Sequence, residues 1–154
     1  MPKIEFKSME ELRKNIGQEI AIGDWQTVTQ EQINLFAEAT GDHQWIHLDE
    51  KRAAEESPYG TTIAHGFLTL SLIPRIMGDT IKLPPAKMTV NYGLNRVRFA
   101  APVPAGKRVR PHLTLLGIEE VTGGFQLSWK VLIEVEGSQK PACIAETLSR
   151  QYTA

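Results

Sequence analysis

The stretch 63–78, IAHGFLTLSLIPRIMG, decides the fold. Apolar side chains cover every face of the helix that it predicts, so this helix must be surrounded by protein instead of lying on the surface. Thr61 or Thr62 can cap its start, and Pro74 should kink or end it locally. A sheet must therefore wrap it. The apolar residues are Ile63, Ala64, Phe67, Leu68, Leu70, Leu72, Ile73, Ile76 and Met77.

The second half of the chain supplies the strands of that sheet. Segments near 87–100, 107–119, 124–136 and 141–152 are separated by the turn signals PVPAG, TGG and EGSQKP. The third segment is the clearest, because apolar and polar residues alternate from Phe125 to Glu136, broken only by Leu132. This alternation is typical of a sheet covered on one face. Helices followed by strands predict an α+β fold.

Capping signals predict further helices in the first half, where a side-chain oxygen accepts a hydrogen bond from a free backbone amide. The first helix should bury Met9, Leu12 and Ile16 and stop at Gly17. A strand is expected over roughly 19–28. A second helix should end at Gly41, after which the chain turns sharply before the next helix starts. The capping residues are Ser8 with Glu11, Thr29 with Gln32, and Asp49.

Composition narrows the classes of function. The 154 residues, 42% of them hydrophobic, suit one compact domain over 1–154. Seventeen Lys and Arg against 18 Asp and Glu give a formal charge of -1, which disfavours binding to nucleic acid or to an acidic membrane. The charged N-terminus lacks the apolar region of a secretory signal, no apolar run reaches membrane-spanning length, and Cys143 has no disulfide partner. We expect a cytoplasmic protein with a buried, inert thiol.

The densest collection of reactive groups is the run 40–47, TGDHQWIH, which lies in a bend between two helices. Asp42 and His47 are five residues apart, so they converge only if the chain turns between them, and Gly41 makes that turn plausible. A carboxylate beside an imidazole can exchange protons with one water near neutral pH. The alternative is structural: Asp42 caps the following turn, and His47 is a partly buried histidine with its hydrogen bonds satisfied.

A second feature is the run 64–66, AHG, in the first turn of the buried helix, where backbone N–H groups have no intrahelical acceptor. Because Gly66 has no side chain, a carbonyl oxygen could approach its amide, as in an oxyanion hole. Alternatively, Gly66 lets the helix pack against a strand. His65 is as compatible with a structural role as with a functional one.

The segment ATGDHQWIH…AHGF resembles the hydratase motif of the MaoC-like (R)-specific enoyl-CoA hydratases, and the segment NYGLNRVRFAAPVPAG is also similar to members of that family. This resemblance implies a hot-dog fold, in which a curved antiparallel β-sheet wraps a long central helix. It also implies that Asp42 and His47 are catalytic and that the Gly66 amide binds the thioester carbonyl. The family pattern commonly has Asn-Pro where this chain has Gln44-Trp45.

The resemblance implies the hydration of a trans-2-enoyl-CoA, or the reverse dehydration of an (R)-3-hydroxyacyl-CoA. Thioester conjugation already makes C3 electrophilic, so no metal or redox cofactor is needed, and coenzyme A is part of the substrate. Arg96 and Arg98, which share a strand face, and Lys107 are candidates for binding the coenzyme phosphates. Similar proteins pair their sheet edges, so we expect a homodimer.

Three competing interpretations stay open. The protein could be a metal-dependent hydrolase, because His43 and His47 would both face a metal if HQWIH were helical, with Asp42 or Asp49 as a third ligand. A hot-dog domain could instead act as an acyl-CoA thioesterase, directing water to the thioester carbonyl. It could also be a non-catalytic acyl-thioester binding module. Candidate walls of the substrate pocket are Gln44, Trp45, Tyr59 and Phe67, and His65 is a further candidate for binding the substrate.

Overall fold

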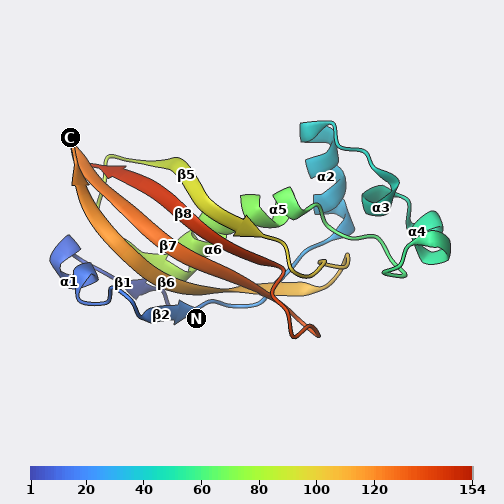
Figure 1. Ribbon diagram of the computed structural model, residues 1–154, viewed down its shortest axis with the longest axis horizontal. Coiled ribbons are helices and arrows are strands. Elements are labelled where there is room, and N and C mark those ends of the chain that lie inside the picture. Colours follow the sequence, from blue (N-terminus) through green and yellow to red (C-terminus); the bar gives the residue numbers. More distant parts are fainter. Residues whose placement is uncertain (154) are drawn as a thin grey trace.

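The computed structural model describes residues 1–153, in which an antiparallel sheet curves around a pair of helices (Figure 1). The strand order in this sheet is β2-β6-β7-β8-β5, with β3 also paired to β6, and β1 and β4 form a small parallel pair. The helices are α1 Met9–Arg13, α2 Gln30–Thr40, α3 Trp45–Leu48, α4 Glu50–Glu56, α5 Gly66–Ser71 and α6 Ile73–Thr80. The strands are β1 Ile4–Glu5, β2 Glu19–Ile22, β3 Gln26–Thr27, β4 Ile81–Lys82, β5 Met88–Arg98, β6 Arg108–Val121, β7 Gly124–Val135 and β8 Cys143–Tyr152.

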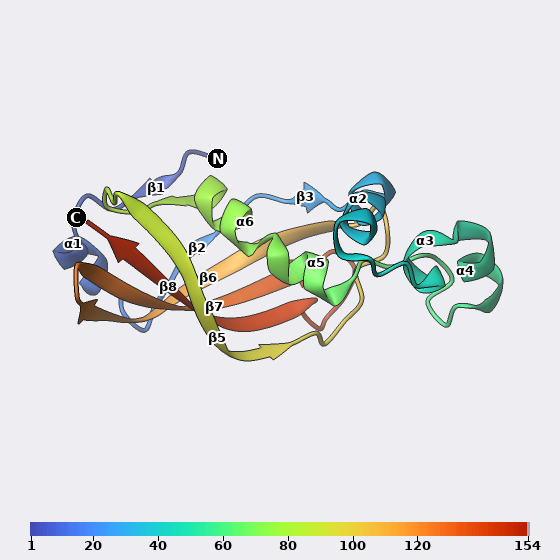
Figure 2. The same cartoon turned by 90° about the horizontal axis from the view of Figure 1, so that it is seen from above.

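The four long strands lie where alternation and turn signals predict them, within two residues at each end. In β7 the side chains of Leu127, Trp129 and Val131 are buried on the face toward the helices, whereas Lys130 between them is exposed. This pattern follows from the two-residue period of a strand covered on one face. The predicted α+β architecture is confirmed, and Figure 2 shows α5 and α6 running along the sheet.

The central helix differs from the prediction in its start and its continuity. It begins at Gly66, not near Thr61 or Thr62, because the preceding backbone is extended: Ile63 N donates to Ile46 O and Ala64 N to Val103 O. Leu72 separates α5 from α6, and Pro74 lies in the first turn of α6. This interruption agrees with the kink or end that the sequence predicts at Pro74. The expected burial on every face is wrong along one stripe of α5 and α6, where Phe67, at 68%, and Ser71, Pro74, Arg75 and Gly78 are exposed.

The local signals of the first half are confirmed where they depend on caps. The side chains of Ser8, Thr29 and Asp49 accept hydrogen bonds from backbone amides three residues ahead. The strand expected over 19–28 is interrupted between β2 and β3, where a side chain on Gly23 would collide with Pro111. Ile16, expected to face inward, is 41% exposed because α1 already ends at Arg13.

One hydrophobic core joins the helices to the sheet, from Phe6 near the N-terminus to Ala145 on β8. Cys143 is fully buried in this core, and burial raises the pKa of its thiol to about 11, so the thiolate is disfavoured at neutral pH. Within residues 1–153, no helix is both long enough and apolar enough to cross a membrane.

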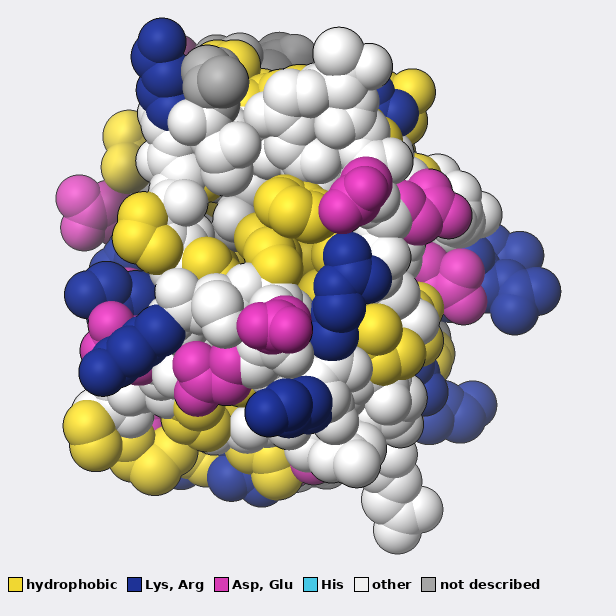
Figure 3. All heavy atoms as spheres, turned by 90° about the vertical axis from the view of Figure 1, so that its left-hand side faces the viewer, with side chains coloured by type: hydrophobic (Ala, Val, Ile, Leu, Met, Phe, Trp, Pro, Cys, Tyr) yellow, Lys and Arg dark blue, Asp and Glu magenta, His cyan; other side chains and the backbone are white. Residues whose placement is uncertain are grey.

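The two ends of the molecule carry different secondary-structure elements. Helices α2, α3 and α4 gather at one end, opposite to α1 and the C-terminus (Figure 1). The face toward α1 carries Lys and Arg interspersed with Asp and Glu around small hydrophobic patches (Figure 3). Charges of both signs on one face agree with the near-zero formal charge of the chain.

Candidate active site

The loop after α2 brings Asp42 and His47 to the start of α5. Helix α2 ends at Gly41, which takes a left-handed conformation with φ 83°, and the short helix α3 carries His47. The Asp42 carboxylate accepts a hydrogen bond of 3.3 Å from Gln44 N, so this residue does cap the following turn. The cap leaves the other carboxylate oxygen available, because a carboxylate has several acceptor positions. The structural and functional interpretations of Asp42 are therefore compatible.

His47 is held so that one ring nitrogen is free. The side chain is 7% exposed, and its Nδ1 lies 2.7 Å from the carbonyl oxygen of Ile63. A carbonyl only accepts hydrogen bonds, so Nδ1 carries the proton and Nε2 of the neutral ring keeps its lone pair. Ile63 thereby fixes the tautomer that a general base requires.

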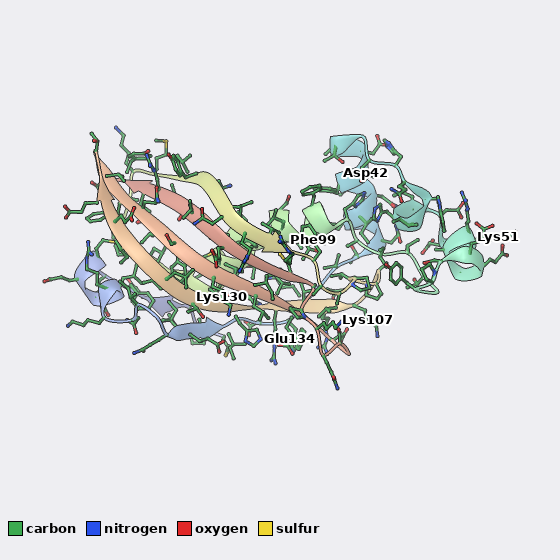
Figure 4. All side chains as sticks on the ribbon, viewed as in Figure 1. Asp42, Lys51, Phe99, Lys107, Lys130 and Glu134 are labelled. Atoms are coloured by element: carbon green, nitrogen blue, oxygen red, sulfur yellow. The ribbon has the colours of Figure 1, made fainter. Side chains whose placement is uncertain are left out.

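The acid–base groups converge in space. Donor atoms of Asp42, His47 and His65 all lie within 4.8 Å of one another, with Asp42 exposed and both histidines buried. One water can contact a carboxylate and an imidazole at such a separation. Figure 4 shows Asp42 at the end of α2, whereas Lys51 on α4 lies well away from it.

The surroundings of His47 keep it neutral. Burial lowers the pKa of His47 below its ordinary value of 6.5, and repulsion from His65 lowers it further. The hydrogen bond to Ile63 and the charge of Asp42 act in the opposite direction. A neutral imidazole at physiological pH accepts a proton directly, which suits a general base.

His65 lies in the protein interior, in contact with both Asp42 and His47. Its ring is 2% exposed and stacks on that of His47 with centroids 3.8 Å apart, and the Phe36 ring lies 4.9 Å away. Its Nε2 donates to the backbone carbonyl of Asp42 at 3.0 Å, while its Nδ1 is buried without a partner among the described residues. His65 thus touches both members of the pair through the protein interior.

This arrangement does not suit a metal ion. The stacked rings of His47 and His65 are inclined by only 23°, so their in-plane lone pairs do not converge on one point. His43, the other ligand considered, lies outside α3 and bonds to Glu38 Oε1 at 3.1 Å on the surface. The donor geometry therefore favours proton transfer through Asp42 and His47.

Gly66 is the first residue of α5, where its N–H has no intrahelical acceptor. A methyl group on Gly66 would lie 2.8 Å from Cδ2 of Phe99, which follows β5 directly and lies beside α5 in Figure 4. Close packing against Phe99 therefore gives a steric reason for glycine here. The amide also has no acceptor among the described residues, so the two interpretations of Gly66 are again compatible.

The other predicted substrate residues are more scattered. Gln44 is exposed at the start of α3, and Tyr59 is 49% exposed in the turn after α4. Trp45 is covered by the guanidinium of Arg52, 4.1 Å from the ring centroid. Phe67 makes an edge-to-face contact with Phe99, 6.0 Å between centroids, beside Gly66. Of these residues, Phe67 is the one that the described contacts place at the start of α5.

The basic candidates lie on the other face of the sheet. Arg96 pairs with Glu146 and Arg98 with Ile144, whereas Val97 between them pairs with the buried Ala145. Alternation therefore places Arg96 and Arg98 together, as predicted, but on the face away from α5. Lys107 lies in the turn before β6, where its amide donates to the carbonyl oxygen of Pro104 and its carbonyl oxygen accepts from Val28 N.

Sequence patterns did not identify the side chains and carbonyl groups that hold the loop between α2 and α3 in place. Gln30 donates to the carbonyl oxygen of His47 at 2.7 Å and accepts from the hydroxyl of Thr62, so α2 is tied to α3 and to the segment before α5. The Ile63 carbonyl and the Phe36 ring are the other supports. A backbone carbonyl leaves no signal in a sequence, and Gln30 resembles any polar residue in a first helical turn.

A large cavity lies farther along the central helices. It has a volume of about 790 Å³ and runs between α6 and the strands β5 and β8. Leu70, Ile73, Pro74 and Met77 form its helical wall, and Thr147, Ser149 and Gln151 of β8 contribute to the opposite wall. Leu70 follows Gly66 by four residues, about 6 Å along a helix, and none of Asp42, His47 and Gly66 lines the cavity itself.

Comparisons with known proteins agree with this architecture. The family model described as MaoC like domain matches residues 11–134. The chain is 51% identical to 3-hydroxyacyl-thioester dehydratase Z of Mycobacterium tuberculosis (strain ATCC 25618 / H37Rv) over 146 residues, 94% of this chain and 96% of that protein. It is 43% identical to Nodulation protein N of Rhizobium leguminosarum bv. viciae, covering 92% and 89% of the two chains.

A solved structure confirms the arrangement of helix and sheet. R-Hydratase PhaJ1 from Pseudomonas aeruginosa superposes with a TM-score of 0.68 at 24% identity, over 90% of this chain and 83% of that one. At this identity the likeness concerns the fold, and it confirms the predicted hot-dog architecture, with an open sheet. With the family match over most of the sequence, the chain belongs to the MaoC-like domain family.

Proposed function

We propose that this protein hydrates trans-2-enoyl thioesters to (R)-3-hydroxyacyl thioesters, or catalyses the reverse dehydration. The observation that carries the proposal is the pairing of Asp42 with a neutral His47 whose free Nε2 is fixed by the bond to Ile63. The names of relatives support it: one is a 3-hydroxyacyl-thioester dehydratase, and a shorter match is a 3-hydroxybutyryl-CoA dehydratase at 46% identity over 72 residues.

The reaction needs one water and no net proton. The thioester carbonyl would accept a hydrogen bond from the Gly66 amide, which stabilises the enolate-like charge as water adds to C3. The pair of Asp42 and His47 takes one proton from that water and returns one to C2, so the pair ends in its starting state. The reaction as proposed requires no metal or redox cofactor, and coenzyme A enters as part of the substrate.

The cavity beside α6 fits the acyl chain. Its lining starts at Leu70, one helical turn after Gly66, and its helical wall is apolar through Leu70, Pro74 and Met77. Apolar walls gain free energy when they cover hydrocarbon, at about 25 cal/mol per Å² of buried surface. The volume of about 790 Å³ accommodates a chain longer than that of crotonyl-CoA.

The edge strand β5 supports the proposal of a homodimer. Ten of its eleven residues are exposed, Val97 being the exception, and β8 is its one partner among the described strands. An unpaired edge with exposed apolar side chains is a site for strand pairing. Light scattering should give about twice 17.2 kDa, and a monomer that stays fully active on dilution would contradict the dimer. The exposed apolar residues are Met88, Val90, Tyr92 and Leu94.

The basic residues Arg96, Arg98 and Lys107 remain our candidates for the phosphates of coenzyme A. Because Arg96 and Arg98 project from the sheet face away from α5, they would meet the coenzyme at the outer side of β5. Replacing both by Gln should raise KM for enoyl-CoA severalfold at low salt and less at high salt. An unchanged KM at both salt concentrations would exclude this role.

The decisive experiment uses purified protein with crotonyl-CoA and trans-2-octenoyl-CoA. Loss of conjugated absorbance without release of free thiol, and an (R)-configured product, are expected. Thiol release would indicate a thioesterase instead. Binding of the substrate without turnover would indicate a binding module.

A further inference from the structure

The wall that β8 gives to the cavity is polar where a core-facing strand is normally apolar. The side chains of β8 that face the helices are Cys143 and Ala145 in the buried core, and then Thr147, Ser149 and Gln151 along the cavity. The register shows that these positions face the helices, because they pair with the inward residues Trp129, Leu127 and Phe125 of β7. The change from apolar to polar coincides with the start of the cavity.

The neighbouring strand continues this polar surface. Thr89 of β5 pairs with Gln151, and Asn91 pairs with Ser149, and both line the same cavity. The apolar side chains of this part of β5, Met88 and Val90, occupy the alternate positions and are exposed. From Met88 to Asn91, β5 therefore turns its polar side chains toward the cavity and its apolar ones away, whereas Leu94 farther along the strand adds an apolar side chain to the lining. We call the five residues Thr89, Asn91, Thr147, Ser149 and Gln151 the polar wall.

Gln151 is the part of the polar wall that most requires an explanation. Its side chain is 2% exposed, and its Oε1 is buried without a hydrogen-bond partner among residues 1–153. The indole nitrogen of Trp129, which also lines the cavity, is buried and unpartnered in the same way. An unpaired buried polar group costs free energy, so such groups are rare unless a ligand or water meets them, and a ligand in the cavity would meet Gln151 Oε1 once the side chain turns toward it.

We propose that the polar wall makes the cavity selective for acyl chains that carry an oxygen substituent beyond C3, a hydroxyl or a keto group. The inference rests on the proposed function, because it takes the cavity as the acyl site. The helical wall covers the hydrocarbon of such a chain, and the opposite wall hydrogen-bonds its oxygen. An amide side chain such as Gln151 offers a donor and an acceptor, and the hydroxyls of Thr147 and Ser149 offer both as well.

The position of the cavity sets where the oxygen must lie. The thioester end is held at Gly66, and the lining begins about 6 Å farther along the helix, at Leu70. A crotonyl chain ends before it reaches the polar wall, whereas the distal carbons of an octenoyl chain reach it. Selectivity for oxygen should therefore be a property of medium and longer chains alone.

The test compares trans-2-octenoyl-CoA with its ω-hydroxy derivative, and each kcat/KM is divided by that of crotonyl-CoA for the same protein. A hydrogen bond to the polar wall should favour the hydroxylated substrate by about 10-fold. In Thr147→Val and Gln151→Met, which remove the polar atoms at nearly constant shape, the preference should fall toward one. The matched control is Thr114→Val, which makes the same change on β6 at a position paired with Lys130, and it should keep the preference.

Calorimetry separates this proposal from the proposed function. Binding of octanoyl-CoA and ω-hydroxyoctanoyl-CoA needs no turnover, so the preference can be measured even if the protein hydrates nothing. Tighter binding of the hydroxylated ligand, lost in Gln151→Met, supports the polar wall. Equal or weaker binding of the hydroxylated ligand by a protein that turns over crotonyl-CoA overturns it and leaves the proposed function intact.

Discussion

The two ends of the central helices differ in how far the protein satisfies its own buried polar groups. At the start of α5, His47 Nδ1 bonds to Ile63 and His65 Nε2 bonds to Asp42, so the tautomers and ring positions are fixed before any substrate arrives, and only His65 Nδ1 is buried without a partner there among the described residues. Beside α6, the polar atoms of Gln151 and Trp129 have no protein partner among the described residues. In the two proposals above, the first end carries out the chemical step, and the second receives a polar group of the substrate.

The largest effect should come from the pair at the first end. Asp42→Asn keeps the shape of the side chain but loses its proton affinity, and His47→Ala removes the imidazole. Each should lower kcat/KM for hydration by about 10²–10⁴-fold with the fold intact. Because both groups act on one water, the double variant should be little worse than the more damaged single variant. Near-normal kcat/KM in both single variants would refute the mechanism, and thermal unfolding provides the control.

His65 tests whether this end is organised through the protein interior. We expect His65→Phe, which keeps a stacked ring, and His65→Asn, which keeps a donor, each to lower kcat by about 10- to 100-fold. Burial, and to a smaller extent repulsion from His65, lowers the pKa of His47 below 6.5. In the wild type, kcat/KM should therefore begin to fall with acidification only below pH 6.5, and we call this fall the acid limb.

Both His65 variants remove the ring whose repulsion lowers the pKa of His47, so this pKa should rise and the acid limb should move to higher pH. The pH profile of kcat/KM for crotonyl-CoA measures this shift. A lower melting temperature with an unmoved acid limb would assign His65 a structural role only.

Gly66 tests how tightly the first end is packed. In Gly66→Ala the new methyl group would lie 2.8 Å from Phe99, so we expect a loss of about 1–3 kcal/mol in the free energy of unfolding. Phe99→Leu in the same chain should recover part of that loss by making room. Gly78→Ala is the matched control, because nothing lies within 4 Å of its added methyl, and it should be neutral or stabilising by up to about 1 kcal/mol. Equal effects of the two alanines would contradict the close packing.

The smallest effect is expected at the second end, beside α6, where a substitution should raise the free energy of unfolding instead of lowering it. Gln151→Met removes an unpaired buried oxygen while keeping the length of the side chain, so the free protein should become more stable by about 1 kcal/mol. Denaturant unfolding with an unchanged slope measures it. If the variant is instead less stable, Gln151 is satisfied in the free protein and the contrast between the two ends fails.

Local chemistry made much of the fold predictable. The cap at Thr29 and the left-handed Gly41 depend on neighbours within a few residues, and the alternation in β7 depends on one covered face. The start of the central helix was missed because Ile63 and Ala64 bond to Ile46 and Val103, partners that no local pattern identifies. Hydrophobicity likewise could not show that Phe67 would be exposed, since it does not say where a surface lies.

The sequence predicted which residues form the candidate site better than it predicted the contacts that hold them in place. Asp42 and His47 come together as their spacing around Gly41 suggested, although Asp42 also caps a turn. The stacking of His65 on His47 requires the chain to return from α4, which sequence spacing does not encode. The polar wall was hidden for a related reason: Thr147, Ser149 and Gln151 alternate with side chains of mixed character, so neither face of β8 is marked as the inner one.

Gln30 couples the local opening of α2 to that of α3 and of the segment before α5. Its side-chain amide bonds to the His47 carbonyl and to the Thr62 hydroxyl, so the first turn of α2 joins two segments that are 15 residues apart in the sequence. Local opening of α2 would break both bonds at once and release α3 together with the strand-like segment before α5. These three segments should therefore exchange their amide hydrogens as one cooperative unit, separate from the sheet, and a ligand held at the loop would slow the exchange of all three.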